Sequence, residues 1–295
     1  MAKFTPNETE ACSRLIAMAL EEDLGAVGDR TSLSIIPADA QGQAAFVARA
    51  DGVLAGSPAA IMVLQAIEPL LHLEASVQDG DTLKNGDRIA TVSGPMRGIL
   101  TAERTALNFL QHLSGVASMT RRFVDAVAGL PALILDTRKT LPGWRLLDKY
   151  AVRCGGGHNH RLGLHDGILI KDNHLAGLQI SDVSLQIEEA VRRARSYLHK
   201  NGLSLPVEIE VDTLEQFDVA LAYKPDMILL DNMPPALLRK AAERRNASAA
   251  SVLLEASGGV TLETVRAIAE TGVDRVSIGA LTHSAPALDI ALDYV

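Results

Sequence analysis

The chain has 295 residues, a formal net charge of −8 and 47% hydrophobic residues, which supports a large core and excludes a disordered protein. With 3% aromatic residues and an acidic balance, it lacks the basic face and stacking side chains of a nucleic-acid binder. Two cysteines, no signal-peptide pattern and no run of 18 apolar residues predict a soluble cytoplasmic protein.

The first third of the sequence predicts a small α/β unit. Apolar residues recur at helical spacing from Glu8 to Leu24, and Gly25 marks the end of that helix. Two strands are expected at Gln43–Arg49 and Leu70–Val77, and a helix at Ser57–Ile67 should cover them.

A hairpin and a long helix follow. Asn85-Gly86, between strand-like residues of the stretch Asp79–Gly94, predicts a hairpin turn. A helical pattern then runs over Ile99–Val127, with Thr101 as its cap and Gly115 as a break. A long helix between two different patterns is typical of a domain connector, so we place a boundary near residue 115.

The second half alternates short apolar runs with helical segments, which predicts parallel strands joined by helices. Six strands are too few for an eightfold barrel, so an incomplete α/β barrel is favoured over an open doubly wound sheet. The expected strands are Leu133–Asp136, Ile168–Lys171, Val207–Val211, Met227–Asp231, Val252–Ala256 and Val276–Gly279. The expected helices are Trp144–Arg153, Ser181–Lys200, Thr213–Tyr223, Pro234–Asn246 and Thr261–Thr271.

Each of these strands ends in polar residues or glycine. The carboxyl ends of barrel strands carry the chemistry in such folds, and the last turns commonly hold phosphate. The strand-end residues are Asp136, Lys171, Glu210, Asp231, Ser257 with Gly258 and Gly259, and Gly279. They predict one site.

The stretch from Asp136 to His174 is cationic, with seven Lys or Arg against four Asp, and it holds four of the eight histidines. A positive cluster on an acidic chain predicts a small anionic ligand. Arg138 and Lys139 directly follow a strand, where an arginine can grip a carboxylate or phosphate. Three further cations, Arg145, Lys149 and Arg153, share a helix face that we expect to be solvated.

Three histidines leave two interpretations open. His158, His160 and His165 are spaced closely enough for a metal site, but Arg161 beside them favours an anion. We therefore expect His160 and Arg161 to contact an anionic ligand.

Lys171 is compatible with two chemistries. It can form a Schiff base, as in an aldolase, or serve as a fixed positive charge. Glu210 and Asp231 suggest Mg²⁺ coordination or binding of sugar hydroxyls. Glu208 lies on the same strand face as Glu210, and the pattern alone does not decide which of the two reaches the rim.

Two glycine-containing turns predict a phosphate site. Ser257-Gly258-Gly259 precedes the helix expected from Thr261, whose N-terminus would attract an anion. Gly279 ends the next strand.

The order and spacing of these motifs resemble the quinolinate phosphoribosyltransferase family over nearly the whole chain. The matching segments are GDRTS (residues 28–32), TAERTALNFLQHLSG (101–115), DTRKTLPGWRLLDKYAVRCGGGHNHRLGLHDGILIKDNH (136–174), EIEVDTLEQ (208–216), MILLDNM (227–233) and EASGGV (255–260).

The resemblance implies an α/β fold with an N-terminal α/β sandwich domain and an incomplete, open α/β barrel. We expect the first domain to span residues 1–114, with the tail 282–295 packing against it, and the barrel to span 115–281. It also implies a homodimer or larger homo-oligomer.

The resemblance assigns the residues to two substrates. Quinolinate would be held by Arg104 of the neighbouring subunit, Arg138, His160, Arg161 and Lys171. Phosphoribosyl pyrophosphate would be held by Lys139, Glu210, Asp231, Ser257, Gly258, Gly259 and Gly279. Mg²⁺ would be held at Glu210 and Asp231, directly or through water and substrate. The catalytic residues would be Lys139, Lys171, Glu210 and Asp231.

The implied activity is that of a pentosyltransferase of NAD biosynthesis, which converts these substrates to nicotinate mononucleotide, CO₂ and pyrophosphate. Three alternatives remain: a related enzyme with another anionic acceptor, as in the molybdenum-associated relatives, a Schiff-base aldolase, and a non-catalytic anion-binding protein. The dicarboxylate-binding arginines argue against the first.

Overall fold

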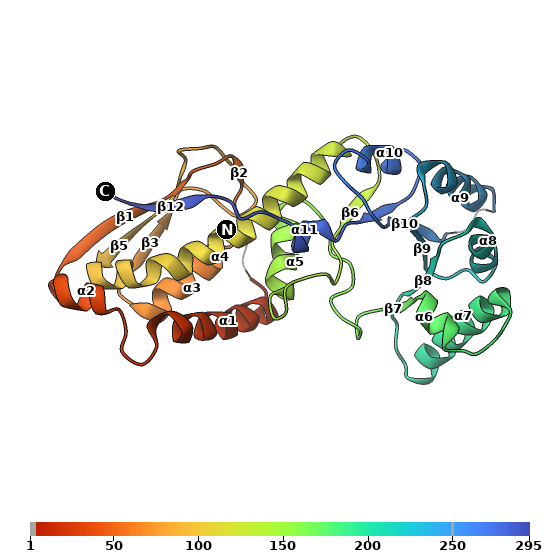
Figure 1. Ribbon diagram of the computed structural model, residues 1–295, viewed down its shortest axis with the longest axis horizontal. Helices are drawn as coiled ribbons and strands as arrows, with labels where there is room; N and C mark the ends of the chain where they lie inside the picture. Colours follow the sequence, from red (N-terminus) through yellow and green to blue (C-terminus); the bar gives the residue numbers. More distant parts are fainter. Residues whose placement is uncertain (1–3, 249–250) are drawn as a thin grey trace. The chain divides into compact units, whose positions relative to one another are not determined.

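The computed structural model describes residues 4–248 and 251–295 (Figure 1). The chain forms two compact units that interleave in sequence. The first comprises Met1–Arg121, Lys139–Gly157 and Ala280–Val295, and the second comprises Arg122–Arg138 and His158–Gly279. The domain limits expected at residues 114/115 and 281/282 stay predictions.

An antiparallel sheet with the strand order β12-β1-β5-β3 forms the centre of the first unit. Its strands are β1 (Gln41–Ala48), β3 (His72–Ala75), β5 (Arg88–Pro95) and β12 (Ile290–Tyr294). The strands expected near residues 43–49 and 70–77 are thus confirmed as β1 and β3. The last strand of the chain lies beside β1 (Figure 1), with Ala44 opposite Tyr294 and Ala48 opposite Ile290.

The predicted hairpin is wrong, although its turn forms. The N–H of Asp87 donates to the carbonyl of Lys84 over 3.0 Å. However, β4 (Thr82–Leu83) pairs with β2 (Gly52–Val53), because β5 is already paired on both edges by β1 and β3. The two strands that flank the turn therefore belong to different sheets.

The helices of the first unit follow their local signals closely. In α1 (Pro6–Leu24), the hydroxyl of Thr5 accepts from the Glu8 amide, and the Glu8 carboxylate accepts from the Thr5 amide over 2.7 Å. This capping box fixes the helix start. The expected helix α3 (Ser57–Ile67) is confirmed. Two short helices were not expected, α2 (Arg30–Ile35) and α11 (Ala280–His283).

The long helix α4 (Met96–Ala126) is continuous, so the predicted break at Gly115 is wrong. A Cβ at Gly115 would lie 2.1 Å from the backbone oxygen of Pro286, so glycine is required there for close packing. Thr101 does not cap the helix, because it lies within it. Its hydroxyl donates to Asp29 Oδ2 over 3.1 Å instead.

Replacing Gly115 with alanine is expected to lower the free energy of unfolding by about 1–3 kcal/mol, because the added methyl group overlaps Pro286. Chemical denaturation would measure the change. Asp125→Ala, at an exposed position of the same helix, is the control and should have little effect. A Gly115→Ala variant as stable as the parent would show that the segment at Pro286 moves aside without cost.

Helix α5 (Arg145–Cys154) corrects the expectation of a solvated cationic face. Lys149 is fully buried. The helix packs against α1, and Arg153 donates to Glu8 over 2.6 Å. The cations at this spacing therefore face protein as well as solvent.

The second unit is an open parallel sheet with the strand order β6-β11-β10-β9-β8-β7. The strands are β6 (Leu133–Leu135), β7 (Ile168–Ile170), β8 (Val207–Val211), β9 (Met227–Asp231), β10 (Leu253–Ser257) and β11 (Arg275–Ser277). All six expected strands are confirmed. Because β6 and β7 are the two edges of the sheet, the expected incomplete barrel is confirmed as well.

Helices connect these strands (Figure 1). They are α6 (Asp172–Ala176), α7 (Val183–Lys200), α8 (Leu214–Ala222), α9 (Pro235–Ala247) and α10 (Val265–Ala269). The last begins at Val265 and not at the expected Thr261, because residues 262–264 form turns. Within the described residues, none of the helices has the length and apolar character needed to cross a bilayer.

Candidate active site

The second unit brings several predicted strand-end residues to one edge of its sheet. Glu210 aligns with Leu229 on the neighbouring strand, and Asp231 at the end of β9 aligns with Ser257 at the end of β10. Lys171 directly follows β7, whose last residue pairs with Ile209. Since all strands are parallel, these groups share the carboxyl edge, as predicted.

Lys171 and Glu210 form an ion pair between Nζ and Oε2. The lysine side chain is 42% exposed and the glutamate side chain 14%, so the pair lies at the surface of the site. This arrangement favours a fixed positive charge over the Schiff-base interpretation, which needs a neutral amine.

Asp231 lies next to the glycine turn that follows β10. Its carboxylate accepts from the side-chain amide of Asn232 over 2.7 Å. A Cβ at Gly258 would lie 2.1 Å from Asn232 Oδ1, and Gly258 has a φ of 95°, so glycine is required at this position. The turn is therefore built against the Asp231 strand end.

The helix that follows this turn does not begin where the anion-binding argument placed it. Helix α10 starts at Val265 and is only five residues long, so no helix N-terminus at Thr261 faces the turn. Exposed Gly258 and Gly259 still leave open backbone beside Asp231. Gly279 follows β11 at the same edge, two residues beyond Ser277, which aligns with Leu135.

Two arginines of the second unit, Arg138 and Arg161, are near enough for their positive charges to interact. Burial lowers the pKa of Arg161, the nearby positive charge of Arg138 lowers it further, and Glu208 acts in the opposite direction. Arg161 donates to the carbonyl of Gly167 over 3.1 Å. The Nε of Arg138 is buried without a hydrogen-bond partner among the described residues. Two guanidinium groups near enough for their charges to interact, one of them with an unused buried donor, suit an anion with two carboxylates.

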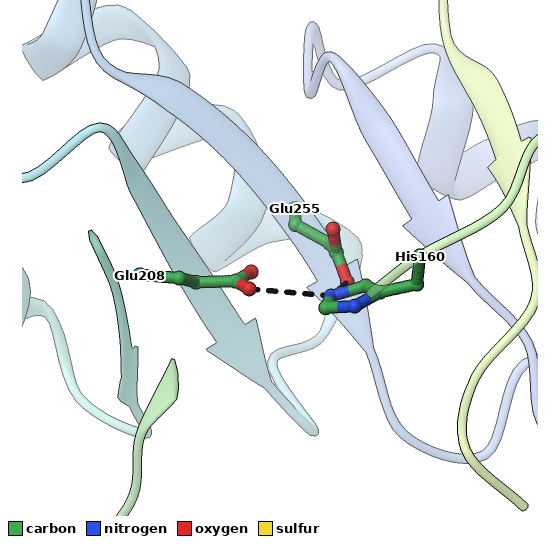
Figure 2. Close-up of side chains that lie close together, drawn as sticks. All are labelled: His160, Glu208 and Glu255. Atoms are coloured by element: carbon green, nitrogen blue, oxygen red, sulfur yellow. Dashed lines mark ion pairs between the residues drawn. The ribbon is translucent and has the colours of Figure 1, made fainter. Parts of the chain in front are cut away.

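His160 reaches the interior of the barrel, where it meets two acids (Figure 2). Its Nε2 lies 3.2 Å from Glu208 Oε2 on β8 and 3.2 Å from Glu255 Oε1 on β10. Both acids are buried, Glu208 being 2% and Glu255 0% exposed. On the other side of the ring, the N–H of Arg161 donates to Nδ1 over 2.7 Å.

Within the cluster of His160, Glu208 and Glu255, the pKa values of His160 and Glu208 are shifted upward. Burial lowers the pKa of His160, but the hydrogen-bonding carboxylates outweigh this effect and raise it to about 9. Burial also raises the pKa of Glu208. The Arg161 amide donates to Nδ1, so Nε2 is the ring nitrogen that donates toward the two carboxylates in this geometry.

The backbone around His160 is fixed by a buried acid at the end of β6. Asp136 accepts from the backbone N–H of His160 over 2.8 Å and from the side chain of Asn159 over 2.6 Å. Asp136 is completely buried. Asp136, which was predicted as a strand-end residue, therefore holds the segment that carries His160 and Arg161.

The structure does not bring together the three histidines of the alternative metal site, His158, His160 and His165. Among the described residues, the single group of three potential ligands within 4.8 Å is His160, Glu208 and Glu255. His158 and His165, the other two proposed ligands, are exposed and lie outside it. Sequence reasoning missed Glu255 as a partner of His160. An acid inside the apolar run LLEAS was the signal that marked it.

A cavity of about 190 Å³ borders the same cluster. Pro206, Met227 and Arg275 line it at the starts of their strands, together with His160 and Arg161. Glu210 and Asp231 do not line it. The cavity therefore approaches the cluster from the amino-terminal ends of the strands.

Two predicted residues belong to the first unit. Arg104 is exposed on α4. Lys139 directly follows Arg138 in the sequence, and its carbonyl accepts from the hydroxyl of Thr282 over 2.7 Å. These two residues are thus carried by elements other than the six-stranded sheet.

Comparison with known proteins gives matches over both halves of the chain. Family models described as the N-terminal and C-terminal domains of quinolinate phosphoribosyl transferase match residues 29–114 and 116–293. The chain is 46% identical to nicotinate-nucleotide pyrophosphorylase (carboxylating) of Mycobacterium leprae, with 97% of this chain and 98% of that protein covered.

Two further matches agree. Quinolinate phosphoribosyltransferase (decarboxylating) 1b of Nicotiana tabacum is 42% identical and covers 94% of this chain and 81% of its own length. The crystal structure of nicotinate-nucleotide pyrophosphorylase from Ehrlichia chaffeensis superposes with a TM-score of 0.87 at 38% identity, with both chains fully covered.

Proposed function

The chain belongs to the quinolinate phosphoribosyltransferase family, and we propose that it transfers phosphoribosyl from phosphoribosyl pyrophosphate to quinolinate with decarboxylation. The products are nicotinate mononucleotide, CO₂ and pyrophosphate, so the enzyme is a pentosyltransferase of NAD biosynthesis. The observation that carries this proposal is the gathering of charged groups at the carboxyl edge of one sheet, where Lys171 pairs with Glu210, Asp231 ends the neighbouring strand, and Arg138 follows β6.

In this proposal the two carboxylates of quinolinate meet Arg138, Arg161 and Lys171, with His160 as a further member of the set. Planar guanidinium groups bind carboxylates through two parallel hydrogen bonds, and the free donor of Arg138 supports such a contact. Arg104, exposed on α4, completes the site of a neighbouring subunit in a homodimer or larger assembly.

Phosphoribosyl pyrophosphate is assigned to the carboxyl edge of the sheet. Lys139 offsets the diphosphate charge, while Glu210 and Asp231 face the ribose. The turn at Ser257, Gly258 and Gly259, and the turn at Gly279, supply backbone N–H groups. The exposure of both glycines after Ser257 supports close approach of a phosphate.

The acids at this edge also suit Mg²⁺. Glu210 and Asp231 offer the carboxylate oxygens that Mg²⁺ prefers, on adjacent strands. They are two in number, which matches an ion that keeps several waters and substrate phosphates as its remaining ligands. When bound, the ion would neutralise charge on the leaving pyrophosphate.

The chemistry follows from the charges. The pyridine nitrogen forms a bond to C1 of the ribose as the C1–O bond to pyrophosphate breaks, and Glu210 and Asp231 stabilise the positive charge that builds on the sugar. The resulting cationic ring accepts the electron pair released when the C2 carboxylate leaves as CO₂, and C2 then takes a proton. Orientation by the arginines contributes about 7–11 kcal/mol in favourable cases.

We assign the sandwich domain to residues 1–114 with the tail 282–295, and the catalytic barrel domain to residues 115–281. The enzyme is placed in the cytoplasm, a reducing compartment. Both cysteines, Cys12 and Cys154, are described and neither is in a disulfide, which agrees with this placement.

A turnover assay tests the proposal. Incubation of the protein with quinolinate, phosphoribosyl pyrophosphate and Mg²⁺ should release CO₂ and form nicotinate mononucleotide in equal amounts. Binding of both substrates without either product would contradict the proposal and would leave an anion-binding protein. Borohydride trapping of a keto substrate on Lys171 would instead support the aldolase alternative.

A further inference from the structure

The cluster of His160, Glu208 and Glu255 holds two buried carboxylates that hydrogen bonding does not fully satisfy. Among the described residues, Oε2 of Glu255 and Oε1 of Glu208 are buried without a hydrogen-bond partner, and Oε1 of Glu255 has only the 3.2 Å contact with Nε2 of His160. Leaving a buried carboxylate oxygen unsatisfied costs about 1–3 kcal/mol or more. A pair of such acids pointing at one imidazole (Figure 2) therefore indicates a role beyond packing.

The two acids contact the His160 ring from two different strands. Glu208 and Glu255 come from β8 and β10, which are held apart by β9 between them in the sheet. Each places an oxygen 3.2 Å from Nε2 of His160. The positive charge of Arg275 lies close enough to Glu208 to affect its pKa and offsets part of the negative charge.

The opposite side of the His160 ring accepts a hydrogen bond from the backbone of Arg161. Because the backbone N–H of Arg161 donates to Nδ1 over 2.7 Å, the orientation of the imidazole determines where this peptide lies. The guanidinium of Arg161 is near enough to Arg138 for their positive charges to interact. A chain of contacts thus leads from the buried acids through the His160 ring to the backbone of Arg161.

We propose that Glu208 and Glu255 are positioning residues for the dicarboxylate: they hold the His160 ring and, through it, place Arg161 for binding. The inference rests on the function proposed above. It assigns to the two acids a role in quinolinate affinity, although neither is expected to touch the substrate.

A double-mutant cycle tests the inference. Glu255→Gln keeps the shape of the side chain and removes its charge. It is expected to raise the KM for quinolinate about tenfold and to leave the KM for phosphoribosyl pyrophosphate within about twofold. In an Arg161→Ala background the same substitution should change the quinolinate KM by less than about twofold, because the arginine that it positions is gone.

Glu208→Gln should give the same pattern, which keeps the test valid if one variant folds poorly. Glu243→Gln makes the same chemical change at an exposed position of α9 and should leave both KM values unchanged. Equal effects of Glu255→Gln in both backgrounds, or equal effects on both substrates, would overturn the inference. If the unmodified protein turns over quinolinate, such a result leaves the proposed function intact; if it does not, the function itself fails.

Discussion

Replacing Arg161 with alanine is expected to raise the KM for quinolinate by at least about 30-fold. Truncating one partner of a buried charge pair costs about 2–5 kcal/mol, and about 1.4 kcal/mol corresponds to a factor of ten. Arg138→Ala should act in the same direction, because the unpartnered Nε of Arg138 is available to a carboxylate and its charge interacts with that of Arg161. Steady-state kinetics with each substrate varied in turn would measure both effects.

The selectivity of these changes matters more than their size. Arg161→Ala should alter the KM for phosphoribosyl pyrophosphate by less than about threefold. Lys139→Ala, in contrast, should weaken the binding of phosphoribosyl pyrophosphate more than the binding of quinolinate. Arg192→Ala removes an exposed arginine that pairs with Glu189 on α7, and it should change neither. Equal effects of Arg161→Ala and Lys139→Ala on both substrates would mean that the two half-sites are assigned wrongly.

Mixing inactive Arg104→Ala subunits with inactive Lys171→Ala subunits is expected to restore about a quarter of the parent activity. If Arg104 completes the neighbouring site, half of the randomly exchanged dimers are hybrids, and each hybrid has one intact site. Activity measured after subunit exchange, relative to each variant alone, provides the test.

A matched mixture distinguishes this arrangement from general rescue. Arg138 and Lys171 both belong to the barrel unit of one chain, so Arg138→Ala and Lys171→Ala subunits should not complement each other. Recovery in this control would point to an unrelated stabilising effect. No recovery in the Arg104 mixture, despite verified exchange of subunits, would place the complete site within one chain.

The strand pattern of the barrel was readable from the sequence because it depends on local order. Buried parallel strands appear as short apolar runs, and each run is followed by the residue that reaches the carboxyl edge. Glu210, Asp231 and Ser257 were therefore placed correctly at that edge before any contact was known. The Lys171–Glu210 pair follows from the same register.

The errors concern residues whose environment is set by distant segments. Gly115 has the sequence signal of a helix break, but Pro286 fills the space beside it. Lys149 has the spacing of a solvated cation, yet α5 packs into the first unit and buries it. Local pattern contains no information about either partner.

Glu255 shows the same limit within the site. Its segment was recognised as part of the family motif, but a single acid in an apolar run does not reveal which histidine it faces. His160 lies 95 positions earlier in the sequence, and only the folding of the barrel brings its Nε2 within 3.2 Å of Glu255 Oε1. Which of Glu208 and Glu210 pairs with a histidine, and which with a lysine, was likewise decided by the fold.

The pairing of β12 with β1 has a consequence for biosynthesis. β1 is synthesised before the barrel, but its outer edge is completed by residues 290–294, which are made after the barrel. Until then the nascent chain exposes an unpaired strand edge, a feature that favours association with other chains. The first sheet is therefore completed only after the barrel has been synthesised, and the barrel strands are made while that sheet is still one strand short.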